Sequence, residues 1–417
     1  MDNIVYFCGA KVSLAPFFVI FYAWELRKFS DLCSMFTDGD WIEAKDQSTE
    51  GVRLIQTGNV GVTQYLDKPN NAKWISEDTF SRLKCEEIFE GDILISRLPD
   101  PAGRACIMPN LGTKMITAVD CTIVRTLPDV NSEYLVQYLS TERYFKEINA
   151  CLAGGTRQRV SRGNLAEFDI PLPNSSDEQR QIGTYFRNLD HLITLHQRKC
   201  ETLKKLKKSM LQKMFPKNGS HFPEIRFAGF TDAWEQRKFS DFTFPAGERN
   251  KDDLDLEPFA ITSNQGFIAQ SEAHDDFGYM KDVDRKMYIV VKPNSFAYNP
   301  ARINVGSLGY YEGAENVIVS SLYEVFQTAE YVDDKFLKHW FKTKAFQDWI
   351  ERLQEGSVRL YFYYDKLCEC IMSMPSVEEQ RKIGAYLDKI DNLITLHQRK
   401  LETLKKLKKA MLQKMFI

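Results

Sequence analysis

The residues of this 417-residue chain that could carry catalytic or metal chemistry are scattered. Its six histidines lack the spacing of metal ligands, and of its nine cysteines only Cys368 and Cys370 lie close together. The nearest match to an amino-methyltransferase signature, at residues 299–302, lacks the second proline and the aromatic residue that would hold an extruded base. No nucleotide-binding loop of the form Gly-x-x-x-x-Gly-Lys-Ser/Thr is present. We therefore expect no catalytic residue, metal or cofactor in this chain, and a reducing, cytoplasmic compartment.

Arginine, asparagine and glutamine gather instead on two kinds of loop, and each kind occurs twice. One follows a predicted strand at residues 97–104, with a counterpart at 299–306; the other contains glycine at 154–159, with a counterpart at 355–360 that lacks the double glycine. Arginine can recognise guanine, and asparagine or glutamine adenine, through paired hydrogen bonds. Alternatively, these are solvated turns whose arginines pair with acidic neighbours. The candidate DNA-binding residues are Arg97, Arg104, Arg157, Gln158, Arg159, Asn299, Arg302, Asn304 and Arg359.

The segments that would position these loops are duplicated. Residues 23–31 recur at 233–241 with one change, and residues 178–216 align without gaps onto 379–417 with 29 of 39 positions identical. Between these segments, residues 32–177 and 242–378 have little in common. The chain is therefore two tandem repeats, each with a variable domain followed by a constant tail. Its 43% apolar and 27% charged residues are sufficient for a sizeable core and exclude a disordered or collagenous chain.

Each constant tail is predicted to form one long helix. Ser175 and Ser376 stand three residues before a glutamate, as in a capping box. Apolar positions then recur at alternating spacings of four and three, which is typical of a coiled-coil seam. The seam residues include Ile193, Leu203, Met210, Ile394, Leu401, Leu404 and Met411. His196 and His397 fall on the same seam, where we interpret them as polar residues that set the register rather than as ligands.

Further leucines widen the apolar stripe beyond the needs of two helices. They either cover the variable domains or bind an external helix. They are Leu192, Leu195, Leu206, Leu211, Leu393, Leu396, Leu407 and Leu412.

The fold class is α+β, with two globular α/β domains joined by two long antiparallel coiled-coil helices as a pseudo-two-fold tandem repeat. A helix of 39 residues is about 60 Å long, and the connector at 217–232 reaches at most about 55 Å. The second helix can therefore pack along the first only by running back. Predicted strands are 52–56, 93–97, 117–125, 286–291, 295–298 and 316–326, and predicted domain helices are 132–151 and 333–353.

Charge is separated along the chain. Residues 190–217 and 391–417 carry net charges of +6 and +5, whereas the whole chain carries −2. The lysine runs in these segments, at 204–208 and 405–409, either contact DNA phosphates or form solvated helix faces. The apolar run from Val12 to Tyr22 is too short to span a membrane, and we interpret it as a buried first strand rather than a targeting segment.

These residues carry a resemblance to a known family. The duplicated Ala-Trp-Glu-x-Arg-Lys-Phe-Ser-Asp segment, the loop at 154–158 that leads to Ile170-Pro171-Leu172-Pro173, and the duplicated Glu-Gln-Arg-x-Ile-Gly segment are similar to the DNA specificity subunit of type I restriction-modification systems. The resemblance extends from Ala23 to the end of the chain. Residues 12–22 depart from it, because the corresponding segment of the second repeat, 222–232, contains acidic residues that they lack; a recombined or mis-chosen start is therefore a further interpretation.

The resemblance implies a division into four parts and a set of partners. Residues 1–175 would form target recognition domain 1, with 1–22 atypical; 176–216 spacer helix 1; 217–375 a linker and target recognition domain 2; and 376–417 spacer helix 2. Each domain would bind one half of a bipartite, asymmetric site in double-stranded DNA. The subunit would not be catalytic and would direct two adenine-N6 methyltransferase subunits and the restriction/translocase subunits, which use S-adenosylmethionine, ATP and Mg²⁺. No membrane association is expected.

Two other classes of function are compatible with the same pattern. One is a coiled-coil scaffold whose globular domains bind protein partners, and the other is a self-contained enzyme. Selection of a split, asymmetric DNA motif from random sequences would favour the adaptor over the scaffold. Methyl transfer by the isolated chain would indicate the enzyme.

Overall fold

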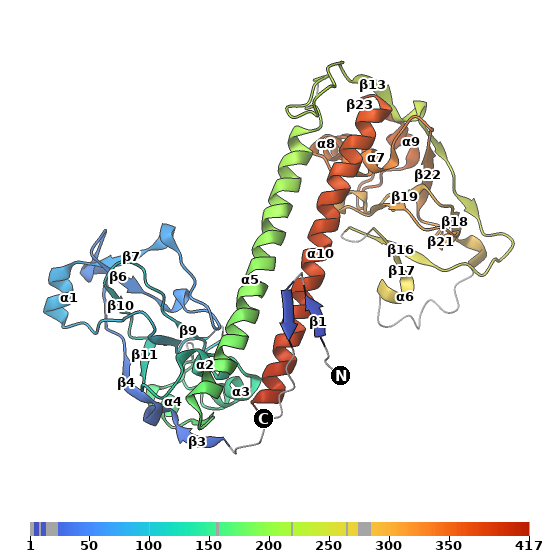
Figure 1. Cartoon of the computed structure of the whole chain (residues 1–417). Coiled ribbons are helices and arrows are strands. Elements are labelled where there is room, and N and C mark those ends of the chain that lie inside the picture. Colours follow the sequence, from blue (N-terminus) through green and yellow to red (C-terminus); the bar gives the residue numbers. More distant parts are fainter. Residues whose placement is uncertain are drawn as a thin grey trace. The chain divides into compact units, whose positions relative to one another are not determined.

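The computed structural model describes residues 4–7, 10–13, 24–99, 101–155, 158–217, 220–263, 266–273 and 285–416 (Figure 1). The chain divides into two compact units. Unit 1 comprises residues 1–196 and 400–417, and unit 2 comprises residues 197–399. Each unit therefore contains one variable domain, the first half of the long helix that follows it and the last part of the other long helix.

The variable domain of unit 1 is built on two four-stranded sheets. The first has the order β4 (Cys33–Asp38), β11 (Cys121–Thr126), β8 (Ile93–Ser96) and β9 (Ala105–Ile107), and all of its pairs are antiparallel. The second has the order β10 (Met115–Thr117), β6 (Val52–Ile55), β7 (Lys73–Ile75) and β5 (Gln47–Ser48), with β10 parallel to β6. Helix α1 (Glu77–Leu83) follows β7.

The variable domain of unit 2 has a related framework. Its four-stranded antiparallel sheet has the order β14 (Thr243–Pro245), β22 (Glu324–Thr328), β19 (Ser295–Tyr298) and β20 (Leu308–Tyr311). A three-stranded sheet contains β15 (Glu248–Arg249), β18 (Ile289–Val291) and β21 (Val317–Val319), and a hairpin contains β16 (Phe259–Thr262) and β17 (Gly266–Ala269), which α6 (Gln270–Ala273) follows.

The duplicated segment that begins at Ala23 and Ala233 forms the strand that closes each domain beside its long helix. In unit 1, β3 (Glu25–Lys28) pairs antiparallel with β12 (Asp169–Leu172), the strand that leads into the helix. In unit 2, β13 (Glu235–Lys238) pairs in the same way with β23 (Ile371–Met374). The phenylalanine after each first strand, Phe29 or Phe239, is fully buried. The segment is therefore repeated because it fixes the entry to the helix in both units.

Four predicted elements are each broken in two, at matching places in the two domains. The predicted strand 117–125 is divided between β10 and β11, and 316–326 between β21 and β22, because a turn carries the chain from one sheet to the other. The predicted helix 132–151 is α2 (Ser132–Tyr138) and α3 (Glu142–Ala150), and 333–353 is α7 (Asp334–Trp340) and α8 (Lys344–Leu353). A threonine precedes each second helix, and the hydroxyl of Thr141 accepts a hydrogen bond from the N–H of Tyr144, so a helix start interrupts each predicted helix.

The two long helices are α5 (Ser176–Lys213) and α10 (Val377–Met415) (Figure 1). In unit 1, Leu404, Leu412 and Phe416 from the end of α10 and the residue after it share a core with Leu189 from the first half of α5. In unit 2, Met214 and Phe215, just after α5, share a core with residues of the first half of α10. The start of each helix therefore lies with the end of the other inside one unit, which confirms the antiparallel arrangement.

The seam follows the predicted spacing. Ile394 and Leu404 are buried, and the other five predicted seam residues are partly buried. Of the additional leucines, Leu412 is buried and Leu211 is partly buried, whereas Leu192, Leu195, Leu206, Leu393, Leu396 and Leu407 are 36–46% exposed. The first interpretation of the wide stripe, that it covers the domains, therefore holds only for Leu211 and Leu412.

The N-terminal residues contribute one described hairpin, β1 (Ile4–Phe7) with β2 (Ala10–Ser13). The predicted strand from Val12 to Tyr22 lies outside the described residues beyond Ser13.

Candidate nucleic-acid interface

In each unit, a backbone hydrogen bond ties the chain just after the glycine loop to the other loop that the sequence singled out. In unit 1 the N–H of Val160 donates to the carbonyl of Arg97 at 3.2 Å. In unit 2 the N–H of Phe362 donates to the carbonyl of Pro300 at 3.0 Å. The loop after β8 in unit 1, or after β19 in unit 2, thus forms one surface with the glycine loop of the same unit.

The two glycine loops are equivalent despite the missing double glycine. Both are closed by an antiparallel bridge, Ala153 to Arg159 in unit 1 and Glu355 to Tyr361 in unit 2. Gly154 and Gly356 have φ of +115° and +132°, a region that favours glycine. Nothing lies within 4 Å of a Cβ built on the second glycine of unit 1, at position 155, so the serine that replaces it in unit 2 is accommodated.

Arg97 and Arg104 lie inside their loop and hold it together. Arg97 is 6% exposed; it donates to the carbonyl of Val119 at 2.6 Å and lies 3.4 Å from a carboxylate oxygen of Asp38. The guanidinium of Arg104 donates to five backbone carbonyls at 2.7–3.0 Å. Because Arg97 is buried against Val119 and Asp38 and Arg104 is bonded to the backbone of its own loop, both arginines are placed to shape the surface.

The exposed polar residues of unit 1 lie on the glycine loop. Gln158 and Arg159 are exposed, and the guanidinium of Arg159 is 3.8 Å from a carboxylate oxygen of Asp120. Arg157 lies outside the described residues. Arg162, which sequence analysis did not select, is half exposed and lies 3.9 Å from Asp38. Arg162 begins helix α4 (Arg162–Ala166) just after the loop, and its position three residues after Arg159 was a signal that could have identified it.

Unit 2 presents a different set of side chains on the same framework. Arg302 and Asn304 are exposed beside the short 3₁₀ helix at 303–305, and Arg359 is exposed near the tip of the glycine loop. The side chain of Asn299 is partly buried and accepts a hydrogen bond from the N–H of Ala301 at 3.0 Å, so it shapes the turn.

Two apolar features of the unit 2 surface escaped sequence analysis. Val358, at the loop tip, is 95% exposed. The rings of Tyr361 and Tyr363 stack with an interplanar angle of 3°, and Tyr363 is 47% exposed. Sequence analysis weighed only hydrogen-bonding side chains and so overlooked these residues.

The lysine runs of the long helices have two different environments. Lys207 pairs with Asp391 at 2.5 Å in unit 2, and Lys408 pairs with Asp190 at 2.6 Å in unit 1. Both lysine side chains are 13% exposed, so they belong to the helix packing. The exposed lysines of the runs are Lys204, Lys205, Lys208, Lys405, Lys406 and Lys409.

One cluster in the described part of the chain has the spacing of metal ligands, namely His339, Asp388 and Asp391. Lys338 lies 2.9 Å from Asp388, and Lys207 lies 2.5 Å from Asp391. Ammonium groups therefore occupy the carboxylate positions that a cation would need. The cluster joins α7 to α10 and is not suited to a metal.

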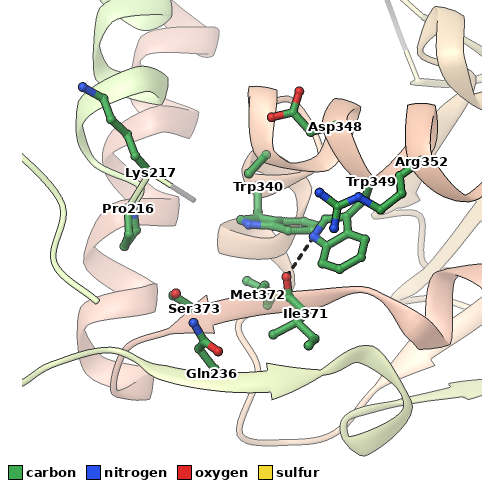
Figure 2. Close-up of a pocket in the computed structure, with 11 residues that line it drawn as sticks. Pro216, Lys217, Gln236, Trp340, Asp348, Trp349, Arg352, Ile371, Met372 and Ser373 are labelled. Carbon is green, nitrogen blue, oxygen red and sulfur yellow. Dashed lines mark hydrogen bonds between the residues drawn. The ribbon is translucent and has the colours of Figure 1, made fainter. Parts of the chain in front are cut away.

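A pocket of about 250 Å³ in unit 2 also lacks catalytic groups (Figure 2). Trp340 and Trp349 line it, and the indole N–H of Trp349 donates to the carbonyl of Ile371 at 3.0 Å. Its one carboxylate, Asp348, pairs with Lys344 at 2.7 Å. The basic lining residues are engaged as well, because Lys217 pairs with Glu224 and the guanidinium of Arg352 lies over the ring of Trp349.

The described helices include none that is long and apolar enough to cross a bilayer. The eight cysteines that the structure describes are all free thiols. Burial raises the pKa of the Cys33, Cys106 and Cys121 thiols to about 12, 12 and 11, which makes these groups poor nucleophiles.

The comparisons with known proteins agree with the repeat architecture. The chain is 21% identical over 413 residues to a protein of Methanocaldococcus jannaschii that is provisionally named as the type I restriction enzyme MjaX specificity subunit, covering 93% of this chain and 92% of that protein. It is 23% identical over 265 residues to the type I restriction enzyme MjaVIII specificity subunit of the same organism, covering 61% and 62% of the two chains. The crystal structure of the type I restriction-modification system S subunit from M. genitalium has the same fold, with a TM-score of 0.61, 13% identity and coverage of 94% and 96%.

The family model described as the type I restriction modification DNA specificity domain matches residues 23–205 and 271–406, which is well over half of the chain. Both matched segments include the glycine loop of a variable domain and most of the helix that follows it. The chain therefore belongs to the DNA specificity subunits of type I restriction-modification systems, the non-catalytic subunits that determine which DNA target is recognised.

Proposed function

We propose that the two variable domains bind the two halves of a split, asymmetric DNA site and that α5 and α10 set the distance between them. The observation that carries this proposal is that equivalent loops present different exposed side chains in the two units. Gln158 and Arg159 are the exposed candidates in unit 1, and Arg302, Asn304 and Arg359 are those in unit 2. Equivalent frameworks with unlike polar groups are expected to select unlike base sequences.

We propose for the functional parts the same boundaries that the sequence predicts. Residues 1–175 and 217–375 form the two target recognition domains, the second with its linker, and residues 176–216 and 376–417 form the spacers. Arg97, Arg104 and Asn299 hold the loops in shape, while the exposed residues contact the bases. The exposed lysines of the spacers contact phosphates between the half-sites, which contributes affinity without sequence preference.

Catalysis is supplied by partner subunits. The six exposed leucines of α5 and α10 form two apolar stripes suited to helices of two adenine-N6 methyltransferase subunits. These subunits use S-adenosylmethionine, and the restriction/translocase subunits of the full complex use ATP and Mg²⁺. The DNA target and the free cysteines are consistent with the cytoplasm.

The first experiment is to map methylated adenines with the chain and its methyltransferase subunits. Arg359→Ala is expected to relax or change only the half-site bound by unit 2, because Arg359 belongs to the loop surface of unit 2. Gln158→Ala removes an exposed polar side chain from the glycine loop of unit 1 and should alter only the other half-site. A motif that is continuous, or that changes in both halves after either substitution, would contradict the proposal; failure to enrich any DNA motif would favour the protein-binding scaffold.

A second experiment tests the spacers. One helical turn inserted at matching positions of α5 and α10 lengthens each helix by about 5.4 Å. Base pairs are about 3.4 Å apart, so the gap in the methylated motif should grow by one or two base pairs. An insertion in only one helix is the control, and it should disrupt the seam. An unchanged gap after the double insertion would refute the spacer role.

A further inference from the structure

Each variable domain is docked on its own long helix by the same hydrogen bonds. The side-chain oxygen of Gln179 accepts from the backbone N–H of Asn131 at 2.9 Å, and its amide donates to the carbonyl of the proline before the helix at 3.0 Å. Gln380 makes the corresponding bonds, with Asp333 at 2.8 Å and with its own proline at 2.9 Å. This shared glutamine therefore cannot distinguish one domain from the other.

A shared glycine brings helix and domain into close contact. A Cβ on Gly183 would lie 2.7 Å from the backbone nitrogen of Tyr134, and one on Gly384 would lie 2.8 Å from that of Phe336. The domain helices α2 and α7 can thus approach α5 and α10 equally closely. By these contacts alone, either domain would fit either helix.

Next to this contact, the two helices differ in sequence by one reversal of charge. The constant tails differ at ten of 39 aligned positions, and only one of these exchanges a basic for an acidic residue. That position is Arg187 in α5 and Asp388 in α10. It lies one turn beyond the shared glycine, so it faces the docked domain from the same place in both units.

The charge on the domain is reversed at the matching position. In unit 1, Arg187 forms an ion pair with Glu133 of α2. In unit 2, the residue at the same place in α7 is Lys335, which lies 3.8 Å from Asp388, and Lys338 one turn later lies 2.9 Å from it. The charge on the helix and the charge on the domain are therefore both reversed between the two units.

The unit 2 pairing is the more buried of the two. The side chain of Asp388 is 16% exposed, and it also accepts a hydrogen bond from the ring Nε2 of fully buried His339 at 2.9 Å. In unit 1 the Arg187 side chain is 58% exposed. A wrong partner would consequently disturb the α10 position more strongly than the α5 position.

We propose that the charge at positions 187 and 388 matches each variable domain to its own spacer helix and disfavours the other. The domain of unit 2 on α5 would place Lys335 against Arg187. The domain of unit 1 on α10 would place Glu133 against Asp388 and Val136 at the place of Lys338, so that this carboxylate would lose both lysine partners. Such exclusion has a role in this chain, because equivalent parts of tandem repeats are prone to misassembly.

A chimera in which residues 32–177 replace residues 242–378 tests the proposal. This full-length chain carries the unit 1 domain before both helices. Asp388→Arg should raise the melting temperature of the chimera, by about 2–4 °C for one restored surface pair, and should lower that of the natural chain by more. The same sign in both chains would overturn the proposal.

The natural chain provides a second test if the chimera does not fold. Arg187→Asp should lower the melting temperature, and adding Glu133→Lys should recover most of the loss. Arg198→Asp, at an exposed position of the same helix, makes the same change in charge and serves as the control. If Arg187→Asp with Glu133→Lys is no more stable than the single substitutions predict additively, the pairing is not selective. These are unfolding measurements, so their outcome is independent of whether the proposed DNA half-sites are correct.

Discussion

Replacing Glu379 by glutamine should destabilise unit 2 strongly. The Glu379 side chain is fully buried and accepts two hydrogen bonds from the guanidinium of Arg226, at 2.7 and 2.8 Å. Arg226 is itself 15% exposed, so Glu379→Gln leaves a largely buried positive charge without its paired carboxylate. Removing one partner of a buried ion pair costs about 3–5 kcal/mol. Because the amide still accepts one hydrogen bond, we expect the lower value, about 3 kcal/mol, and a melting temperature lower by about 6–12 °C.

The repeat supplies a matched control for this substitution. Glu178 holds the same position in unit 1, but there the indole N–H of Trp24 donates to it at 3.2 Å, and the side chain is partly exposed. Glu178→Gln keeps an acceptor for the indole, so it should cost about 1 kcal/mol or less. Calorimetry measures both losses, and hydrogen exchange of β13 and β23 should speed up only in Glu379→Gln. Equal losses of unfolding free energy at the two positions would show that the glutamate acts through its place at the helix start and not through the ion pair with Arg226.

Two other perturbations test the contacts between domain and helix. Burial lowers the pKa of His339, whose Nε2 is hydrogen-bonded and whose Nδ1 has no partner among the described residues, so the folded state disfavours protonation. The stability of unit 2 should therefore fall as pH drops below about 6.5. His339→Gln, which copies Gln137 of unit 1, should make the melting temperature depend less on pH between pH 8 and 5, and an unchanged dependence would contradict this assignment. Gly183→Ala and Gly384→Ala should each lower the free energy of unfolding by about 1–3 kcal/mol, because the new methyl group overlaps the domain helix. Urea unfolding measures the loss, with Gly163→Ala as the control, since a Cβ there meets nothing closer than 3.9 Å. Three equal effects would show that close approach is not the cause.

The long helices could be predicted from sequence because their signal is both periodic and repeated. The spacing of four and three residues identified the seam, and 39 consecutive matched positions left little freedom in its length. The predicted domain elements were less accurate because the apolar pattern continues through a change of sheet. Thr141 and Thr343 were visible helix-start signals, but each lies inside an apolar periodic segment that is also compatible with one helix.

The candidate surface shows a different limit of sequence reasoning. Loop position could be predicted, since one kind of loop follows a recognisable strand and the other contains glycine. Side-chain roles could not, because Arg97 in unit 1 and Arg359 in unit 2 are the same residue type in loops of corresponding surfaces, yet one is buried and the other exposed. Only the fold reveals that the carbonyl of Val119 and the carboxylate of Asp38 surround Arg97.

Comparison of the two repeats indicates what a replacement recognition domain must preserve. The residues shared by both repeats, such as Gln179 and Gly183, contact the domain backbone, so they accept any sequence that folds as α2 or α7. The residues that differ between the loops are free to change with the DNA target. Position 187 belongs to neither group, because its charge must suit the particular domain. A domain grafted before α5 should therefore carry an acid at the position of Glu133, and one grafted before α10 should carry a base at the position of Lys335.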